Sequence, residues 1–233
     1  MSSRLRGLVG AFGALLVVTA VSILVHRLSG YDYPASQAAT FELNVLGDVY
    51  EAFFLVPVGL VGLWALRRGS PWGPLVVAGV ATNLAYNYAM LLTGRQNLWV
   101  LVWIAKLALA ATVSALVWAS LPAGPGRPTR AGRWVSGYRL AATVPFAGMM
   151  LRRLLASATG ASVDMAMQAA GPLDWGAPAR RDPVLFLALV CPLVGAAVAG
   201  TWQGTEWGGR AAAMSSAFIV SIGSIVLFTG PLK

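Results

Sequence analysis

The chain contains seven long apolar segments, and these segments constrain its fold more than any other feature of the sequence. Each approaches the roughly 20 residues that an α-helix needs to cross a hydrocarbon layer of about 30 Å. Lipid cannot satisfy free backbone donors and acceptors, and the segments are apolar at consecutive positions, so they predict helices and not a β-barrel. The segments cover about residues 7–27, 44–66, 73–93, 98–121, 134–151, 184–203 and 210–230.

The composition supports the same class. Apolar residues make up 58% of the chain and charged residues 11%, whereas a soluble domain has about 25% charged residues. We therefore expect an all-α, polytopic transmembrane helix bundle, with residues 1–233 forming a single integral membrane domain in a lipid bilayer. Residues 152–183 are expected to be an extramembrane connection or a lid. The first apolar segment is longer than the 7–15 residues typical of a cleaved signal, so we expect it to be retained as a span.

The basic residues are distributed between the apolar segments. The net charge is +9, but the arginines occur in pairs and triplets, such as Arg67–Arg68, and not in one patch. This distribution is typical of the cytoplasmic ends of membrane helices. It predicts a cytoplasmic N-terminus, a location in a cell membrane and no nucleic-acid partner.

The number of spans depends on the fifth segment, 134–151, which contains Arg139 and Pro145. With seven spans the connection 152–183 faces the outside and places four arginines there. With six spans that connection lies inside, which suits the positive-inside rule better. The arginines thus favour six spans, whereas a weak internal repeat favours seven. We expect seven spans, with six as the alternative.

The repeat consists of two helical hairpins about 135 residues apart. Each has a helix with a proline, a short turn that ends in Trp-Gly, and a second helix. Seven spans orient both hairpins the same way and six spans invert one, and both arrangements occur in transporters. The residues that recur are Asp48, Pro57, Trp72 and Gly73, matched by Asp182, Pro192, Trp207 and Gly208 at offsets of 134 or 135.

Polar residues within the apolar segments are the candidates for a functional site. Asn44, Asp48 and Glu51 share one face of the second segment, and Lys106 lies within the fourth. On the third segment one face carries Thr82, Asn83, Tyr86, Asn87 and Met90. From the 1.5 Å rise per residue, Asp48 lies roughly 6 Å below the outer boundary, Glu51 and Asn87 roughly 10 Å, and Lys106 about 12 Å.

Two interpretations of these polar residues remain open. A Glu51–Lys106 or Asp48–Lys106 ion pair would offset the cost of inserting each charge into lipid. Alternatively, Asp48 caps its helix at the headgroup level and Lys106 extends its long side chain towards the interface. The single cysteine, Cys191, and the single histidine, His26, exclude an intrachain disulfide and a cysteine or histidine metal cluster, so we expect no metal and no cofactor.

The region around the first hairpin resembles an uncharacterised family of bacterial multi-pass membrane proteins. The similarity rests on an Asp-initiated helix with a proline (Asp48, Pro57), an Arg-Gly-Ser turn (68–70) and a Tyr-x-Tyr helix (86–88). The Asp182–Pro192 helix resembles the closing hairpin of that family. The resemblance implies a membrane fold and a spanning fifth segment, and no reaction.

Three functions are compatible with the sequence. The first is a protein that binds or carries a small or lipid-soluble ligand through a polar pocket near the outer leaflet. The second is a membrane enzyme that acts on a prenyl or lipid substrate with Asp48 or Glu51 as general acid. The third is a structural membrane subunit, and the oligomeric state stays open. The expected ligand-binding residues are Asp48, Glu51, Asn83, Tyr86, Asn87, Lys106 and Asp182.

Overall fold

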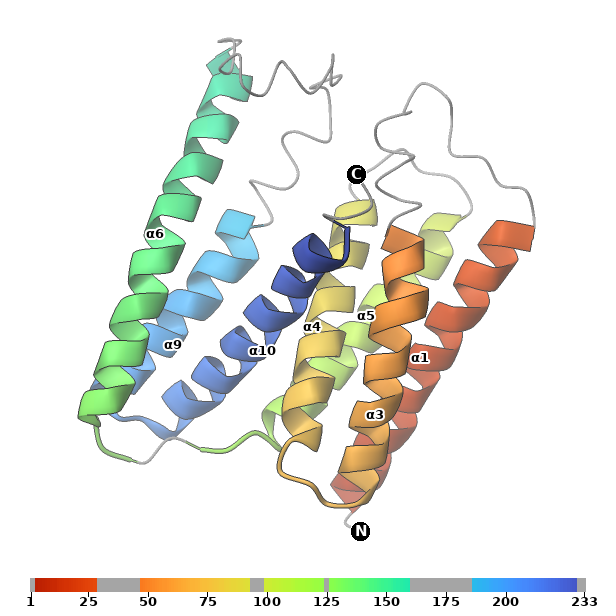
Figure 1. The fold of residues 1–233 in the computed structure, drawn as a ribbon, viewed down its shortest axis with the longest axis horizontal. Helices are drawn as coiled ribbons and strands as arrows, with labels where there is room; N and C mark the ends of the chain where they lie inside the picture. The colour runs from red at the N-terminus through yellow and green to blue at the C-terminus, as the bar shows by residue number, and fades with distance from the viewer. Residues whose placement is uncertain (1–2, 29–46, 93–98, 124–125, 160–185, 230–233) are drawn as a thin grey trace. The chain divides into compact units, whose positions relative to one another are not determined.

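The computed structural model describes residues 3–28, 47–92, 99–123, 126–159 and 186–229. Within these ranges the chain forms seven α-helices and two π-helical segments, with no strand, as the apolar segments predict (Figure 1). The elements are α1 (Ser3–Leu28), η2 (Glu51–Leu55), α3 (Val56–Arg67), α4 (Gly73–Leu92), α5 (Trp99–Trp118), α6 (Arg130–Thr159), η3 (Phe186–Val190), α9 (Cys191–Gln203) and α10 (Glu206–Thr229).

Four of the described helices are long and apolar enough to cross a membrane. They are Ser3–Leu28, Gly47–Arg67, Leu101–Trp118 and Phe186–Gln203. The other expected spans also lie in helices, since 73–93 matches α4, 134–151 lies within α6, and 210–230 matches α10. The helix α6 continues to Thr159, so the first part of the expected connection 152–183 is helical.

The chain divides into two compact units. The first contains residues 1–88, 98–121 and 216–233, and the second contains residues 89–97 and 122–215.

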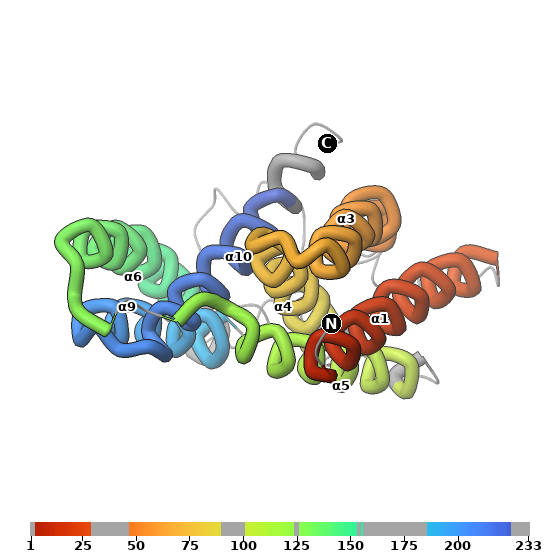
Figure 2. The backbone as a smooth tube through the Cα atoms, turned by 90° about the horizontal axis from the view of Figure 1, so that it is seen from below, coloured from red at the N-terminus to blue at the C-terminus, as the bar shows by residue number. Residues whose placement is uncertain are grey.

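The first unit contains α1, α3, most of α4, α5 and the part of α10 from Ser216 onwards. The helix α1 packs against both α3 and α5 (Figures 1 and 2). Gly59 of α3 makes close packing possible, because a Cβ atom there would lie 2.5 Å from Leu16 of α1. Many of the inward side chains are apolar and fully buried, including Phe12, Leu15 and Val113.

The outward face of these helices is also apolar. Val17 of α1 is 62% exposed, and Leu60 and Trp64 of α3 are more than half exposed. A helix that is apolar all round is typical of a membrane environment, where lipid replaces water on the outer face. The packing of the first unit therefore agrees with the lipid environment that the composition predicts.

In the second unit, α6 packs along η3 and α9. The rings of Phe146 in α6 and Phe186 in η3 meet edge to face, with centroids 4.7 Å apart. After α9 the chain turns sharply into α10, and the turn brings Gly200 and Gly208 into backbone contact. A side chain at either glycine would prevent this approach.

Candidate functional site

The site is built around a buried ion pair between Glu51 and Lys106 in the first unit. Lys106 Nζ lies 3.8 Å from Glu51 Oε2, and both side chains are at most 7% exposed. Lys106 Nζ also donates a hydrogen bond to Ser22 Oγ at 2.9 Å. The sequence left open whether Lys106 pairs with an acid or extends towards the interface, and the structure shows the pair, with Glu51 as the acid.

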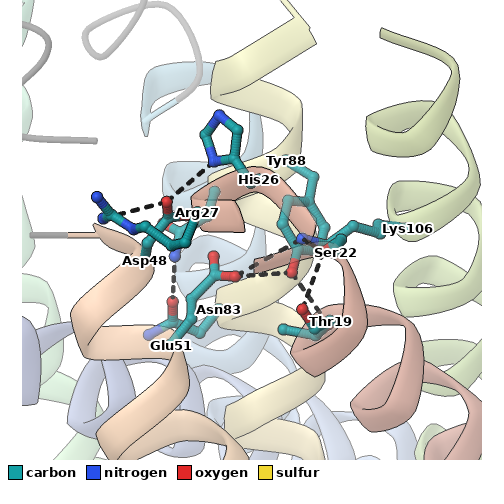
Figure 3. Close-up of polar contacts among 10 residues, drawn as sticks. Thr19, Ser22, His26, Arg27, Asp48, Glu51, Asn83, Tyr88 and Lys106 are labelled. Atoms are coloured by element: carbon teal, nitrogen blue, oxygen red, sulfur yellow. Dashed lines mark hydrogen bonds and ion pairs between the residues drawn. The ribbon is translucent and has the colours of Figure 1, made fainter. Parts of the chain in front are cut away.

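Tyr88 connects this pair to α1. Its hydroxyl donates to Glu51 Oε2 at 2.9 Å and lies 3.1 Å from Thr19 Oγ1. Because a phenol has one proton and Tyr88 gives it to Glu51, Thr19 is the donor in the second contact. The ring of Tyr88 also faces the lysine, with Lys106 Nζ 4.1 Å from its centroid. We call Glu51, Lys106, Tyr88, Thr19 and Ser22 the Glu51 cluster (Figure 3).

A π-helical turn begins at Glu51. The N–H of Val56 bonds to the carbonyl oxygen of Glu51, which is the i to i+5 pattern of a π-helix. Pro57 follows in the first turn of α3, within the continuous helix Gly47–Arg67, and has no N–H to donate to a carbonyl oxygen of the preceding turn. The buried acid is thus carried by the irregular part of an otherwise regular helix.

Asp48 belongs to a second, more exposed charge group. Its Oδ2 atom lies 3.1 Å from His26 Nδ1 and 3.3 Å from Arg27 Nη2. The side chain of Arg27 is 42% exposed, whereas that of His26 is 10% exposed. Asp48 therefore joins the helix Gly47–Arg67 to the end of α1, through a hydrogen bond with His26 and an ion pair with Arg27.

A third group is polar but uncharged. Asn83 of α4 is fully buried and donates to Ser221 Oγ of α10 at 2.9 Å and to Tyr50 Oη at 3.4 Å. Tyr50 donates to the carbonyl oxygen of Ser221 at 2.8 Å. Asn87 donates to Asn83 Oδ1 at 3.0 Å. Asn87 directly precedes Tyr88, which donates to Glu51, so this group adjoins the Glu51 cluster along α4.

The structure brings together most, but not all, of the residues selected from the sequence. Glu51 and Lys106 form the central pair, and Asn87 and Asn83 extend from it, while Asp48 lies one turn from Glu51 with partners of its own. Tyr86 packs edge to face on Phe218, with centroids 5.6 Å apart. Asp182 lies outside the described residues.

Sequence reasoning missed the contribution of α1. Thr19, Ser22 and His26 are spaced three and four residues apart, so they share one helix face, and all three are polar within an apolar segment. That pattern could have identified them. Tyr88 carried no comparable signal, because a tyrosine near a helix end is also typical of an interfacial anchor.

The chemistry of the cluster is that of paired charges held out of water. The Glu51 carboxylate accepts a hydrogen bond from Tyr88 and lies beside the ammonium group of Lys106. The negative and the positive charge therefore compensate each other. Among the described residues, no group of three or more His, Cys, Asp or Glu side chains is placed to hold a metal ion. Such an arrangement can recognise a ligand with complementary charges or exchange a proton between acid and base.

Comparisons of the chain with models of known protein families, with curated proteins and with solved structures gave no match.

Proposed function

We propose that the protein is a multi-pass integral membrane protein that binds and carries a small or lipid-soluble ligand at the Glu51 cluster. The observation that carries this proposal is a buried acid–base pair beside a π-helical turn, within a helix apolar enough to span a membrane. A charge at the centre of a membrane helix costs about 2.5–3.5 kcal/mol, and such charges mark ligand and ion pathways. π-Helical turns are also frequent at functional sites.

The proposed topology has seven spans with a cytoplasmic N-terminus in a bacterial cytoplasmic membrane. The arginines between the apolar segments support the cytoplasmic N-terminus. The seven spans are supported by the repeat and by the helices α4, α6 and α10, which coincide with three further expected spans. Arg67 and Arg68 end the helix that begins at Gly47, and Glu51 lies roughly 24 Å from Arg67 along it. With these arginines inside, the Glu51 cluster lies in the outer half of the bilayer.

The pairing of the carboxylates favours a carrier over an enzyme. A general acid must hold a proton, whereas Glu51 is paired with Lys106 and Asp48 with Arg27. Stability alone also explains the pair poorly, because replacing a buried ion pair by apolar side chains is often neutral or stabilising. A ligand-binding role gives a reason to keep both charges.

The test compares the wild-type protein with the double variant Glu51→Gln, Lys106→Met, in which the pair is neutralised with little change in volume. Both proteins are purified in nanodiscs cut from the native membrane, and the bound small molecules and lipids are extracted and identified by mass spectrometry. Thr112→Val, which alters an exposed position of α5, is the matched control.

We expect a molecule that co-purifies with the wild type and with Thr112→Val and is depleted at least about tenfold in the double variant, a loss of about 1.4 kcal/mol of binding. If the double variant folds and retains the same molecules in the same amounts, the cluster is structural and the proposal is wrong.

A further inference from the structure

The two halves of the chain share one local structure at a constant offset of 135 residues. The π-helical segment Glu51–Leu55 corresponds to Phe186–Val190, and each is followed by a helix with a proline in its first turn. Among the described residues these are the two π-helical segments. Three of the four sequence matches that suggest a repeat have this spacing, and the secondary structure adds an independent match.

The turns after the two helices also agree in backbone geometry. Gly69 has φ +68° and Gly204 has φ +69°, the left-handed conformation that favours glycine. In the first turn Ser70 N donates to Ala65 O at 2.9 Å, and the corresponding bond in the second turn, from residue 205 to residue 200, is also 2.9 Å. A further bond joins residue 69 to 66 in the first turn and 204 to 201 in the second, which completes the same helix-ending motif.

The close approach of the two helices in each hairpin depends on equivalent glycines. A Cβ atom at Gly73 would lie 2.7 Å from the backbone nitrogen of Leu66, and one at Gly208 would overlap the backbone of Gly200. The sequences of the two turns are Gly-Ser-Pro-Trp-Gly (69–73) and Gly-Thr-Glu-Trp-Gly (204–208). In both hairpins a glycine ends the first helix, and a second glycine four residues later allows the next helix to pack closely against the first.

We propose that residues 51–76 and 186–211 are two copies of one hinged hairpin, in which the π-helical turn ahead of the proline is the point where each helix opens. A π-helical turn contains an extra residue and has weaker hydrogen bonding than an α-helix, and the proline removes one backbone donor close to it. Opening therefore concentrates at 51–57 in the first unit and at 186–192 in the second.

The copies differ in the residue that begins the π-helical turn. In the first copy this residue is Glu51, which pairs with Lys106. In the second copy it is Phe186, which packs against Phe146 of α6. The hinge is thus common to both copies, while the charged cluster belongs to the first, so the hinge does not depend on the proposed ligand.

Hydrogen–deuterium exchange of the full-length protein in nanodiscs tests the hinge. We expect residues 51–57 and 186–192 to exchange about tenfold faster than the following turns, 58–64 and 193–199. Deleting one residue from a π-helical turn restores an α-helix. The equivalent positions Phe53 and Ala188 are both exposed, so their single deletions form a matched pair. Each deletion should slow exchange in its own copy and leave the other copy unchanged.

Exchanging the two turns tests the duplication without touching the hinges. The variants are Ser70→Thr with Pro71→Glu in the first copy, and Thr205→Ser with Glu206→Pro in the second. Equivalent hairpins should tolerate either exchange with a change in Tm of less than about 3 °C. The proposal is overturned if the π-helical turns exchange no faster than their neighbours, or if both turn exchanges unfold the protein. Neither result depends on whether a ligand is bound.

Discussion

The ammonium group of Lys106 lies 4.1 Å from the centre of the Tyr88 ring. The same tyrosine donates its hydroxyl proton to Glu51, the ion-pair partner of that lysine. One side chain thus stabilises the cation through its ring and the anion through its hydroxyl. This double contact explains how two charges remain compensated although their closest N···O distance is 3.8 Å.

Removing one charge of the pair should destabilise the protein strongly. In Lys106→Met the buried carboxylate of Glu51 loses its cation, and we expect a loss of about 3–5 kcal/mol. Adding Glu51→Gln should restore most of that loss, because no charge is then left in the apolar interior. Thermal unfolding in detergent measures both effects. A double variant that is as unstable as the single one would contradict the pairing.

The exposed ion pair should contribute far less. Because Arg27 is 42% exposed at its pair with Asp48, we expect Arg27→Gln to lower stability by less than about 1 kcal/mol. Raising the salt concentration should reduce this small effect further, since the charges are screened. The measurement is the unfolding of the wild type and of Arg27→Gln at low and at high salt. A loss of stability as large as that in Lys106→Met would contradict the expectation that exposure weakens an ion pair.

Tyr88→Phe separates the two roles of this residue. The variant keeps the ring beside Lys106 but removes the hydroxyl that bonds to Glu51 and Thr19. We expect a loss of about 1–3 kcal/mol, since the buried carboxylate loses a donor. Tyr138→Phe is the matched control. Because Tyr138 is 76% exposed, loss of its hydroxyl group should leave Tm unchanged.

Alanine substitutions distinguish the packing glycines from the others. Gly73→Ala and Gly208→Ala place a Cβ against backbone atoms and should each destabilise the protein by about 1–3 kcal/mol. At Gly137 and Gly148 of α6 nothing lies within 4 Å of an added Cβ, so alanine should raise stability by up to about 1 kcal/mol through its helix propensity. Unfolding of the four variants side by side checks the contrast.

Asn83→Leu tests the uncharged group. The change removes a donor to Ser221 and the acceptor for Asn87, both within the buried part of the first unit. We expect a loss of about 1–3 kcal/mol, because the remaining polar groups stay buried without their partner. Asn83→Ser, which keeps a small polar side chain, should lose less than Asn83→Leu, and the reverse order in unfolding measurements would contradict the network.

Much of the architecture could be predicted from the sequence because it depends on local properties. Apolar segments of about 20 residues become helices wherever they lie, since their backbones are satisfied internally. The segment 73–93 thus became α4 with the same first residue. The 3.6-residue period placed Asn83 and Asn87 on one face, and they bond to each other.

Tertiary structure alone decided which acid pairs with Lys106. Asp48 and Glu51 share a helix face, and both were within reach by depth. The rotation and packing of α1 direct His26 and Arg27 to Asp48, and Thr19 and Ser22 to the buried pair. Contacts between helices depend on the relative rotation of whole elements, which no single segment encodes.

The sequence by itself therefore determined the helical class, the approximate bounds of the helices and the polar residues that lipid would not tolerate alone. Tertiary structure decided the pairing of the charges. The physical reason is that apolarity and periodicity act within one segment, whereas an ion pair depends on what the neighbouring helices offer at that depth.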